Sequence, residues 1–167
     1  MERRFEPVPL SIEFGEIRWG LLYFTLQLGE QRLETRFSDA YDPIPSFKRW
    51  LEAAAIGVEQ CSFSFETEGV EMRFDLEQAS WECCIFMVGH KYEPGGADGI
   101  TANVDRRQVV ETLYRSFLDL DASPDFPRDA WEPLPDGSGY GQCGTSLSEI
   151  RSPIVEAFLG KQDVDGD

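Results

Sequence analysis

The sequence predicts an α+β domain, with a mainly antiparallel sheet of about six or seven strands packed by two main helices and a short C-terminal helix. Three observations predict this class. Apolar residues alternate with polar ones in several short runs, they recur with helical spacing in two longer runs, and the strand-like runs are separated by short turns. A length of 167 residues fits a single domain, which we expect to span residues 1–162.

The first strands are predicted near the N-terminus. Residues 10–17 alternate apolar and polar side chains, which is the period of a half-buried strand. Residues 19–38 have the pattern of a hairpin, because an alternating run that ends at Leu28 is followed by a Gly-Glu turn and a partner strand.

A change of period then predicts the first main helix. Apolar residues with i, i+3, i+4 and i+7 spacing form one face from Phe47 to Ala55. The start of this helix stays open at this point. Ser46 suits the N-cap position, whereas Pro43 or Pro45 at the first helical position would begin the helix earlier.

A second run of strands follows this helix. Residues 61–66 and 71–76 alternate around a Thr-Glu-Gly turn, so we expect two strands that are solvated on one face. In residues 81–88, both the odd-numbered and the even-numbered positions carry apolar side chains, so both faces of this strand are apolar. This predicts a central strand that is covered on both sides. A short strand at residues 100–104 then leads into the second main helix.

Capping signals mark the two remaining helices. Asp105 and Gln108 resemble a capping box that opens the second main helix, whose apolar face extends to Phe117 and beyond. Ser152, followed by proline at the first helical position, is the predicted N-cap of the short C-terminal helix, and Gly160 is its predicted end.

The segment 121–145 is irregular and rich in Pro and Gly, and a loop of this length in a compact domain is functional, ordered by packing, or a linker. Aromatic side chains ringed by charge are typical of protein interfaces. The alternative is that the aromatic residues of this segment pack in the core or against a sheet edge. We expect the acidic tail, residues 163–167, to be disordered. The residues predicted to contact a partner are Phe126, Asp129, Trp131, Glu132, Asp136 and Tyr140.

The strongest compositional signal is charge: 31 acidic residues against 15 basic ones give a net charge of −16. This field repels phosphate backbones and anionic lipids, and the sequence has no basic stripe, so we predict that nucleic acid is not a partner. The same field attracts basic proteins and steers their association. The alternative is that the acidity serves only solubility.

The sequence also predicts where the protein works. No apolar run long enough for a signal peptide follows the N-terminal residues, and none approaches the roughly 18 residues of a membrane span. We therefore expect a cytoplasmic protein that does not bind membranes. Its four cysteines, Cys61, Cys83, Cys84 and Cys143, have no disulfide-framework spacing and should be reduced thiols.

Two patterns bear on catalysis. Residues 139–144 match the G-x-G-x-x-G string of dinucleotide-binding loops, but that motif must follow a buried strand and open a helix, and this context is missing. His90 is the only histidine, so a small enzyme would have to use it with nearby carboxylates or with Cys84.

Carboxylate clusters give no stronger signal. Glu66, Glu68 and Glu71 surround a predicted turn, where they are better explained as surface charges than as an acid–base pair. One histidine with non-clustered cysteines does not make a zinc site. Residues 163–167 echo the start of a calcium loop, but the later ligands are missing. We therefore predict no catalytic residues, no cofactor and no metal.

Size, acidity, missing catalytic groups and the strand-rich run ending in Asp42-Pro-Ile-Pro-Ser-Phe-Lys-Arg-Trp50 resemble the small cytosolic immunity proteins of bacterial toxin systems. The resemblance is one of general character and carries over no site residues. It implies a protein that neutralises a basic toxin, often a nuclease, by covering its active site with an acidic, aromatic-bearing surface. The alternatives are a structural or adaptor protein with another partner, and a small enzyme built on His90.

Overall fold

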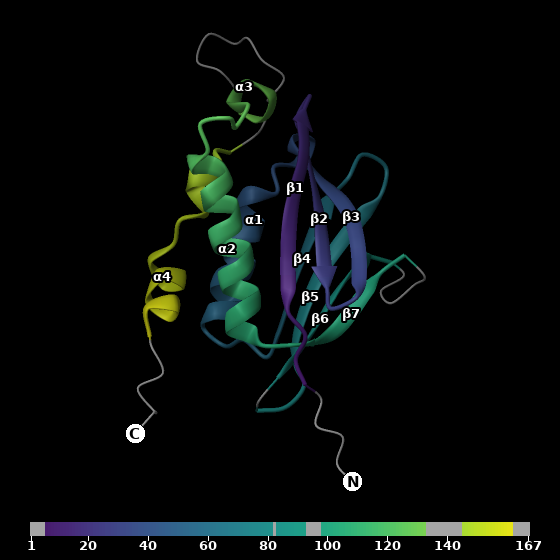
Figure 1. Cartoon of the computed structure of the whole chain (residues 1–167), viewed down its shortest axis with the longest axis vertical. Coiled ribbons are helices and arrows are strands. Elements are labelled where there is room, and N and C mark those ends of the chain that lie inside the picture. Colours follow the sequence, from purple (N-terminus) through teal and green to yellow (C-terminus); the bar gives the residue numbers. More distant parts are fainter. Residues whose placement is uncertain (1–5, 82, 93–97, 133–144, 162–167) are drawn as a thin grey trace.

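The structure is a computed structural model that describes residues 6–81, 83–92, 98–132 and 145–161. It confirms the α+β class (Figure 1). In chain order the elements are β1 (Leu10–Arg18), β2 (Leu21–Leu28), β3 (Gln31–Ser38), η1 (Asp39–Tyr41), α1 (Ile44–Ala55), β4 (Gln60–Glu66), β5 (Glu71–Gln78), β6 (Cys84–His90), β7 (Ile100–Val104), α2 (Arg106–Ala122), α3 (Arg128–Trp131), η2 (Leu147–Ile150) and α4 (Pro153–Gly160).

The strands form two antiparallel sheets instead of the one that was predicted. Among the described residues, three strands pair in the order β1-β2-β3 and four in the order β4-β5-β6-β7. The prediction of one continuous sheet is therefore wrong, because η1 and α1 separate β3 from β4 and these two strands do not pair. Alternating patterns identify each strand and its buried face, but they do not show which strands pair across a helix.

The predicted hairpin of residues 19–38 is confirmed as β2 and β3. Its register is regular from the pair Leu21 and Ser38 to the pair Leu28 and Gln31. On its other side β2 pairs with β1, so β3 is an edge strand of this sheet.

The strand β6 lies inside the four-stranded sheet, as expected for residues 81–88, but only one of its faces is covered. Phe86 and Val88 are buried on the inner face, whereas Ile85 on the outer face is 38% exposed. The expectation of cover on both sides is wrong because the helices lie on the inner side of the sheets (Figure 1). Trp81 precedes the strand and is 89% exposed.

Helix α1 begins earlier than a Ser46 N-cap would allow, as the proline alternative expected, but its first helical residue is Ile44 and not Pro43 or Pro45. Its N-cap is Pro43, and the Asp42 carboxylate accepts a hydrogen bond from the backbone N–H of Ile44 at 3.3 Å. Ser46 therefore lies within the first turn. The predicted apolar face is buried as expected, from Phe47 onwards.

Both predicted N-caps of the later helices are confirmed. The Asp105 carboxylate accepts a hydrogen bond from the backbone N–H of Gln108 at 2.8 Å, and the Ser152 hydroxyl accepts one from the N–H of Val155 at 3.3 Å. Gln108 does not close a capping box. Its side-chain amide instead bonds the backbone N–H and C=O of Leu10, at 3.1 and 2.8 Å, and so ties α2 to the start of β1.

Two consecutive arginines at the start of α2 hold the C-terminal ends of the other two long helices. Arg106 donates to the carbonyl oxygen of Ala54 in the last turn of α1 at 3.0 Å, and to that of Val58 just beyond the helix at 3.1 Å. Arg107 donates to the carbonyl oxygens of Phe158 and Leu159 in α4. Cations at these positions satisfy terminal carbonyls and complement the helix dipoles.

Aromatic side chains fill the space between the helices and the sheets. Phe37 of β3 joins the two sheets, since its ring centroid lies 5.0 Å from that of Phe65 in β4 and 5.5 Å from that of Phe117 in α2. We call the following buried set the aromatic core: Phe24, Phe37, Phe47, Trp50, Phe63, Phe65, Phe74, Phe86 and Phe117. Around it, the buried apolar cluster includes residues from Leu10 to Leu159.

The segment predicted to be irregular is partly helical. Helix α2 continues into it as far as Ala122, and the short helix α3 follows. Residues 133–144 and the acidic tail lie outside the described part of the chain. Within that part, no helix is long and apolar enough to cross a membrane.

Candidate functional site

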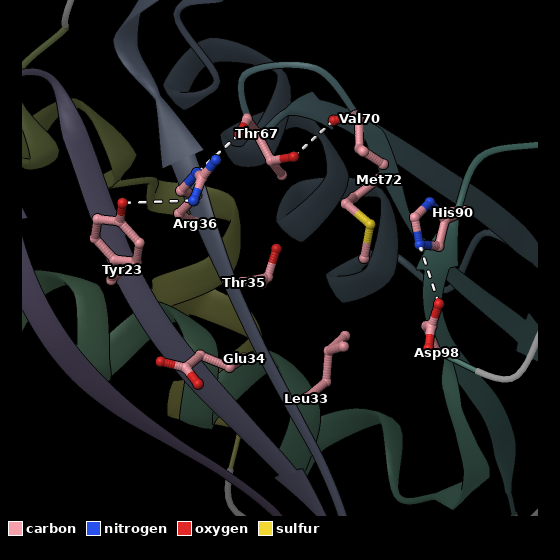
Figure 2. Close-up of a pocket in the computed structure, with 10 residues that line it drawn as sticks. All are labelled: Tyr23, Leu33, Glu34, Thr35, Arg36, Thr67, Val70, Met72, His90 and Asp98. Carbon is pink, nitrogen blue, oxygen red and sulfur yellow. Dashed lines mark hydrogen bonds and ion pairs between the residues drawn. The ribbon is translucent and has the colours of Figure 1, made fainter.

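A pocket of about 470 Å³ opens where the edge strand β3 faces the ends of β5 and β6 (Figure 2). Its size lies within the usual range for ligand pockets. The two sheets approach each other here without pairing. The residues that line it are Tyr23, Leu33, Glu34, Thr35, Arg36, Thr67, Val70, Met72, His90 and Asp98.

The pocket exists because the inward-pointing residues of β3, β5 and β6 change from closely packed apolar side chains to smaller or polar ones along each strand. Phe74 and Val88, which are paired neighbours on β5 and β6, are fully buried. The next pair on the same face is Met72 and His90, and both line the pocket. On β3 the corresponding step runs from Phe37 to Thr35. Smaller or polar side chains thus replace the aromatic rings that fill the core.

Two threonines supply hydroxyl groups to the pocket. Thr35 is 9% exposed, and no hydrogen bond among the described residues engages its hydroxyl, which Figure 2 shows directed away from the β3 backbone. The Thr67 hydroxyl donates to the carbonyl oxygen of Val70 at 2.8 Å and keeps its own lone pairs available. Both hydroxyls can therefore accept a hydrogen bond from a ligand, and Thr35 can also donate one.

Arg36 closes one end of the pocket. Its Nε donates to the carbonyl oxygen of Thr67 at 2.8 Å, its Nη1 lies 3.4 Å from the Tyr23 hydroxyl, and its guanidinium lies 5.4 Å from the centre of the Tyr23 ring. The arginine therefore links the outer face of the three-stranded sheet to the β4–β5 turn.

His90 forms the opposite wall. Its Nε2 lies 3.9 Å from a carboxylate oxygen of Asp98, whose side chain is 84% exposed. A second hollow of about 350 Å³, lined by Gly69, Val70, Glu71, His90 and Tyr92, shares Val70 and His90 with the first. The two hollows therefore adjoin each other at Val70 and His90.

This arrangement does not assemble the nucleophilic pair that the sequence left open. Cys84 and His90 lie at opposite ends of β6, six residues apart, which is about 20 Å at the rise of a strand. Cys84 Sγ donates to Gln78 Oε1 at 3.3 Å, and burial raises the pKa of this thiol. A Cys84–His90 dyad is therefore out of reach. No serine or cysteine is among the described residues that line the pocket.

The partner-contact residues predicted between positions 121 and 145 have mixed locations. Phe126 and Trp131 are buried, and Trp131 Nε1 donates to the carbonyl oxygen of Thr145 at 3.3 Å. For these two aromatic residues the packing alternative therefore holds. Asp129 is exposed, and Glu132 forms an ion pair with Arg128 at 3.3 Å. Asp136 and Tyr140 lie outside the described residues, as do the G-x-G-x-x-G string and the tail aspartates.

The three glutamates at the β4–β5 turn do not converge on a catalytic pair. Glu71 forms an ion pair with Lys91 at 2.7 Å, and this bond raises the pKa of Lys91. Glu68 is exposed in the turn and has a φ of 63°. Among the described residues, no group of three or more potential metal ligands occurs.

Sequence reasoning missed most of the pocket. A signal was present in the strand patterns, because Thr35 occupies an inward position between Leu33 and Phe37, and His90 continues the inward parity of Phe86 and Val88. Polar residues at inward positions mark a place where the core is interrupted. Only the packing of the two sheets shows that these interruptions lie together.

Comparison with known proteins finds no matching family model, no matching curated protein and no matching solved structure. The chemistry of the pocket and its rim is therefore the basis on which a function can be proposed.

Proposed function

We propose that this protein is a binding domain without catalytic chemistry of its own, and that the open end of its two sheets holds a basic protein partner. The observation that carries the proposal is a rim of exposed carboxylates around a pocket with apolar walls. Glu34 and Asp98 line the pocket, and Glu68 lies in the β4–β5 turn next to the lining residue Thr67. Val70 is 38% exposed and Tyr92 is 82% exposed beside it. An apolar centre with a charged rim is the usual composition of a protein interface.

The local charge balance supports a cationic partner. Two nearby cations are engaged: Lys91 pairs with Glu71, and Arg36 donates to the Thr67 carbonyl. A third, Arg32 of β3, is exposed and has no hydrogen bond or ion pair with another described residue. No described residue forms an ion pair with Glu34 or Glu68. Together with a net charge of −16, these carboxylates create a field that steers basic proteins toward the open end.

In its specific form, the proposal is that the partner is a basic toxin and that binding neutralises it by covering its active site. This form follows the resemblance to immunity proteins and requires no chemistry from the binding domain. It also implies that neither nucleic acid nor a membrane is the target, since both carry the same sign of charge as the rim.

The test is affinity capture from a lysate of the source cells at low and high salt, with the wild-type chain and two matched variants. The rim variant carries Glu34→Gln, Glu68→Gln and Asp98→Asn. The control variant carries Glu59→Gln, Asp119→Asn and Glu149→Gln, which removes three exposed carboxylates at other places. Both variants change the net charge by the same amount.

We expect the wild-type and control chains to capture the same basic protein at low salt, and the rim variant to lose most of it. Equal loss with both variants would show that only total charge matters. Undiminished capture by the rim variant would place the interface elsewhere and contradict the proposal.

A further inference from the structure

The pocket lies beside the hydrogen-bonding edge of β3 and not over one of its faces. Four consecutive residues of this strand, Leu33 to Arg36, line it. Because successive side chains of a strand point to opposite faces, a hollow above one face would be lined by alternate residues only. Contact with all four shows that the hollow follows the strand edge.

The backbone of Glu34 is turned toward this hollow. The N–H of Asp39 donates to the carbonyl oxygen of Gly20 at 2.8 Å, and the register of β2 and β3 continues from there without a bulge. In an antiparallel pair, the residues whose N–H and C=O face the partner strand alternate with those whose groups face away. Phe37, Thr35 and Leu33 therefore face β2, and Glu34 between them faces the open side.

The edge is closed at both ends and open in the middle. At one end the Gln31 side-chain amide bonds the backbone C=O and N–H of Thr101 in β7, at 2.7 and 3.1 Å, as a strand partner would. At the other end Arg36 reaches the Thr67 carbonyl. Between these two links, no hydrogen bond among the described residues engages the backbone of Glu34 on its open side.

The walls of this gap suit a short extended peptide. An added strand would place the side chain opposite Glu34 on the face of β3 that carries Arg32, Glu34 and Arg36, where the Glu34 carboxylate directly opposite favours a cation. The neighbouring side chains would point inward, toward Leu33, Met72 and the Thr35 hydroxyl that no described residue engages (Figure 2). The gap thus selects a basic residue flanked by apolar ones.

We propose that an extended segment of the basic partner adds to the open edge of β3 as a short strand, with its backbone paired to Glu34. This inference rests on the proposed function and specifies how the partner is held. Backbone pairing supplies affinity that does not depend on sequence, and the alternating walls supply preference for a basic residue between apolar ones.

The test uses the full-length chain, labelled with ¹⁵N, and the probe peptide acetyl-Lys-Val-Lys-Val-Lys-amide, titrated by NMR. We expect saturable shifts at the backbone amides of Glu34, Thr35 and Thr67 and at the ring of His90, which is the only histidine and therefore gives unambiguous signals. The acidic peptide acetyl-Glu-Val-Glu-Val-Glu-amide should cause no shifts at these groups.

Methylation of the backbone amide nitrogen of the central lysine in the basic peptide isolates the contribution of backbone pairing to affinity. The modified peptide keeps every charge but cannot donate that hydrogen bond, so we expect its dissociation constant to rise by about tenfold or more. Glu34→Gln keeps the backbone of β3 and should weaken binding only about two- to fivefold. Glu34→Pro removes the N–H at an edge position where proline is tolerated, and should abolish binding.

The outcomes separate this inference from the proposed function. If the methylated peptide binds as tightly as the parent, or if the shifts lie away from β3, strand addition is wrong, while capture of a basic partner by the acidic rim can still hold. Absence of any saturable binding of the basic peptide also contradicts strand addition. Should Glu34→Pro fail to fold, the two peptides alone decide the question.

Discussion

The same two sheets have a closed region and an open one, separated by two residues along each strand. In the closed region Phe37, Phe74 and Val88 are fully buried under α1 and α2. In the open region the next inward residue on each strand is Thr35, Met72 or His90, and the space between the sheets stays empty enough to form a pocket.

This difference separates the part of the fold that is tightly packed from the part that contains the proposed interface. Phenylalanine rings contribute large buried areas and edge-to-face contacts, so the closed region should carry most of the folding free energy. The open region contributes less to stability because its polar groups are left available. Binding sites are commonly drawn from such less stable parts of a structure.

The largest effect should come from Phe37→Ala in the closed region. Phe37 is fully buried and has ring contacts with five other phenylalanines, Phe24, Phe47, Phe63, Phe65 and Phe117. We expect a loss of about 3–5 kcal/mol in the free energy of unfolding, measured by urea denaturation. Met72→Ala is the matched change beside the pocket and should cost about 2 kcal/mol, because no enclosed cavity is left. Equal losses would remove the distinction between the two regions.

A smaller effect is expected from Arg106→Met, which removes the cation that holds the end of α1 on the closed region. The hydrogen bonds to Ala54 and Val58 are lost, but water can reach part of this site. We expect a loss of about 1–2 kcal/mol in urea denaturation. Arg115→Met serves as the control, since the one contact of Arg115 with a described residue is an exposed ion pair with Glu111. Its loss should change stability by about 0.5 kcal/mol or less. Similar losses in both variants would argue against a capping role.

The closed region should also determine how stability changes in alkali. Burial raises the pKa of the Cys61 thiol from 9.0 to about 11. As the pH rises, the thiol ionises in the unfolded chain before it ionises in the folded protein. The contribution of Cys61 to the free energy of unfolding is therefore fully present below pH 9 and is lost as the pH approaches 11. We expect Cys61→Ala to show a shallower decline of unfolding free energy over this range, measured at several pH values. An unchanged slope would mean that other groups cause the alkaline loss.

The smallest effect should come from Thr35→Val in the open region. Its hydroxyl has no partner among the described residues, so its removal should change stability by about 0.5 kcal/mol or less. Ser152→Ala is the matched hydroxyl deletion in the closed region. Ser152 accepts from Val155 and donates to Glu52, so about 1–2 kcal/mol should be lost. A loss at Thr35 as large as that at Ser152 would give Thr35 a structural role instead.

Local elements were predictable because their causes lie within a few residues of sequence. The Asp105 and Ser152 caps, the β2–β3 hairpin and the buried face of α1 all depend on short spacings between side chains and backbone. The error in sheet number arose where a helix interrupts the strands, since pairing across such a connection depends on the packing of distant parts.

The candidate site was predictable only in part. His90 was singled out, but as a catalytic candidate, and the aromatic residues chosen for an interface, Phe126 and Trp131, are buried. An aromatic residue in an irregular segment has no periodicity that distinguishes core from surface. Thr35 and Met72 gave no signal as a pair, because they lie on strands of different sheets.

The sequence by itself determined the α+β class, the strands, the inward faces of the strands whose patterns alternate, the N-caps of α2 and α4 and the strongly acidic charge, because each follows from local spacing or composition. Only the tertiary structure decided that there are two sheets and that β3 faces the ends of β5 and β6 across the pocket without pairing. The physical reason is that Phe37 is buried among rings from both sheets, which brings β3 beside the four-stranded sheet, whereas no described strand pairs with the backbone of Glu34 on its open side.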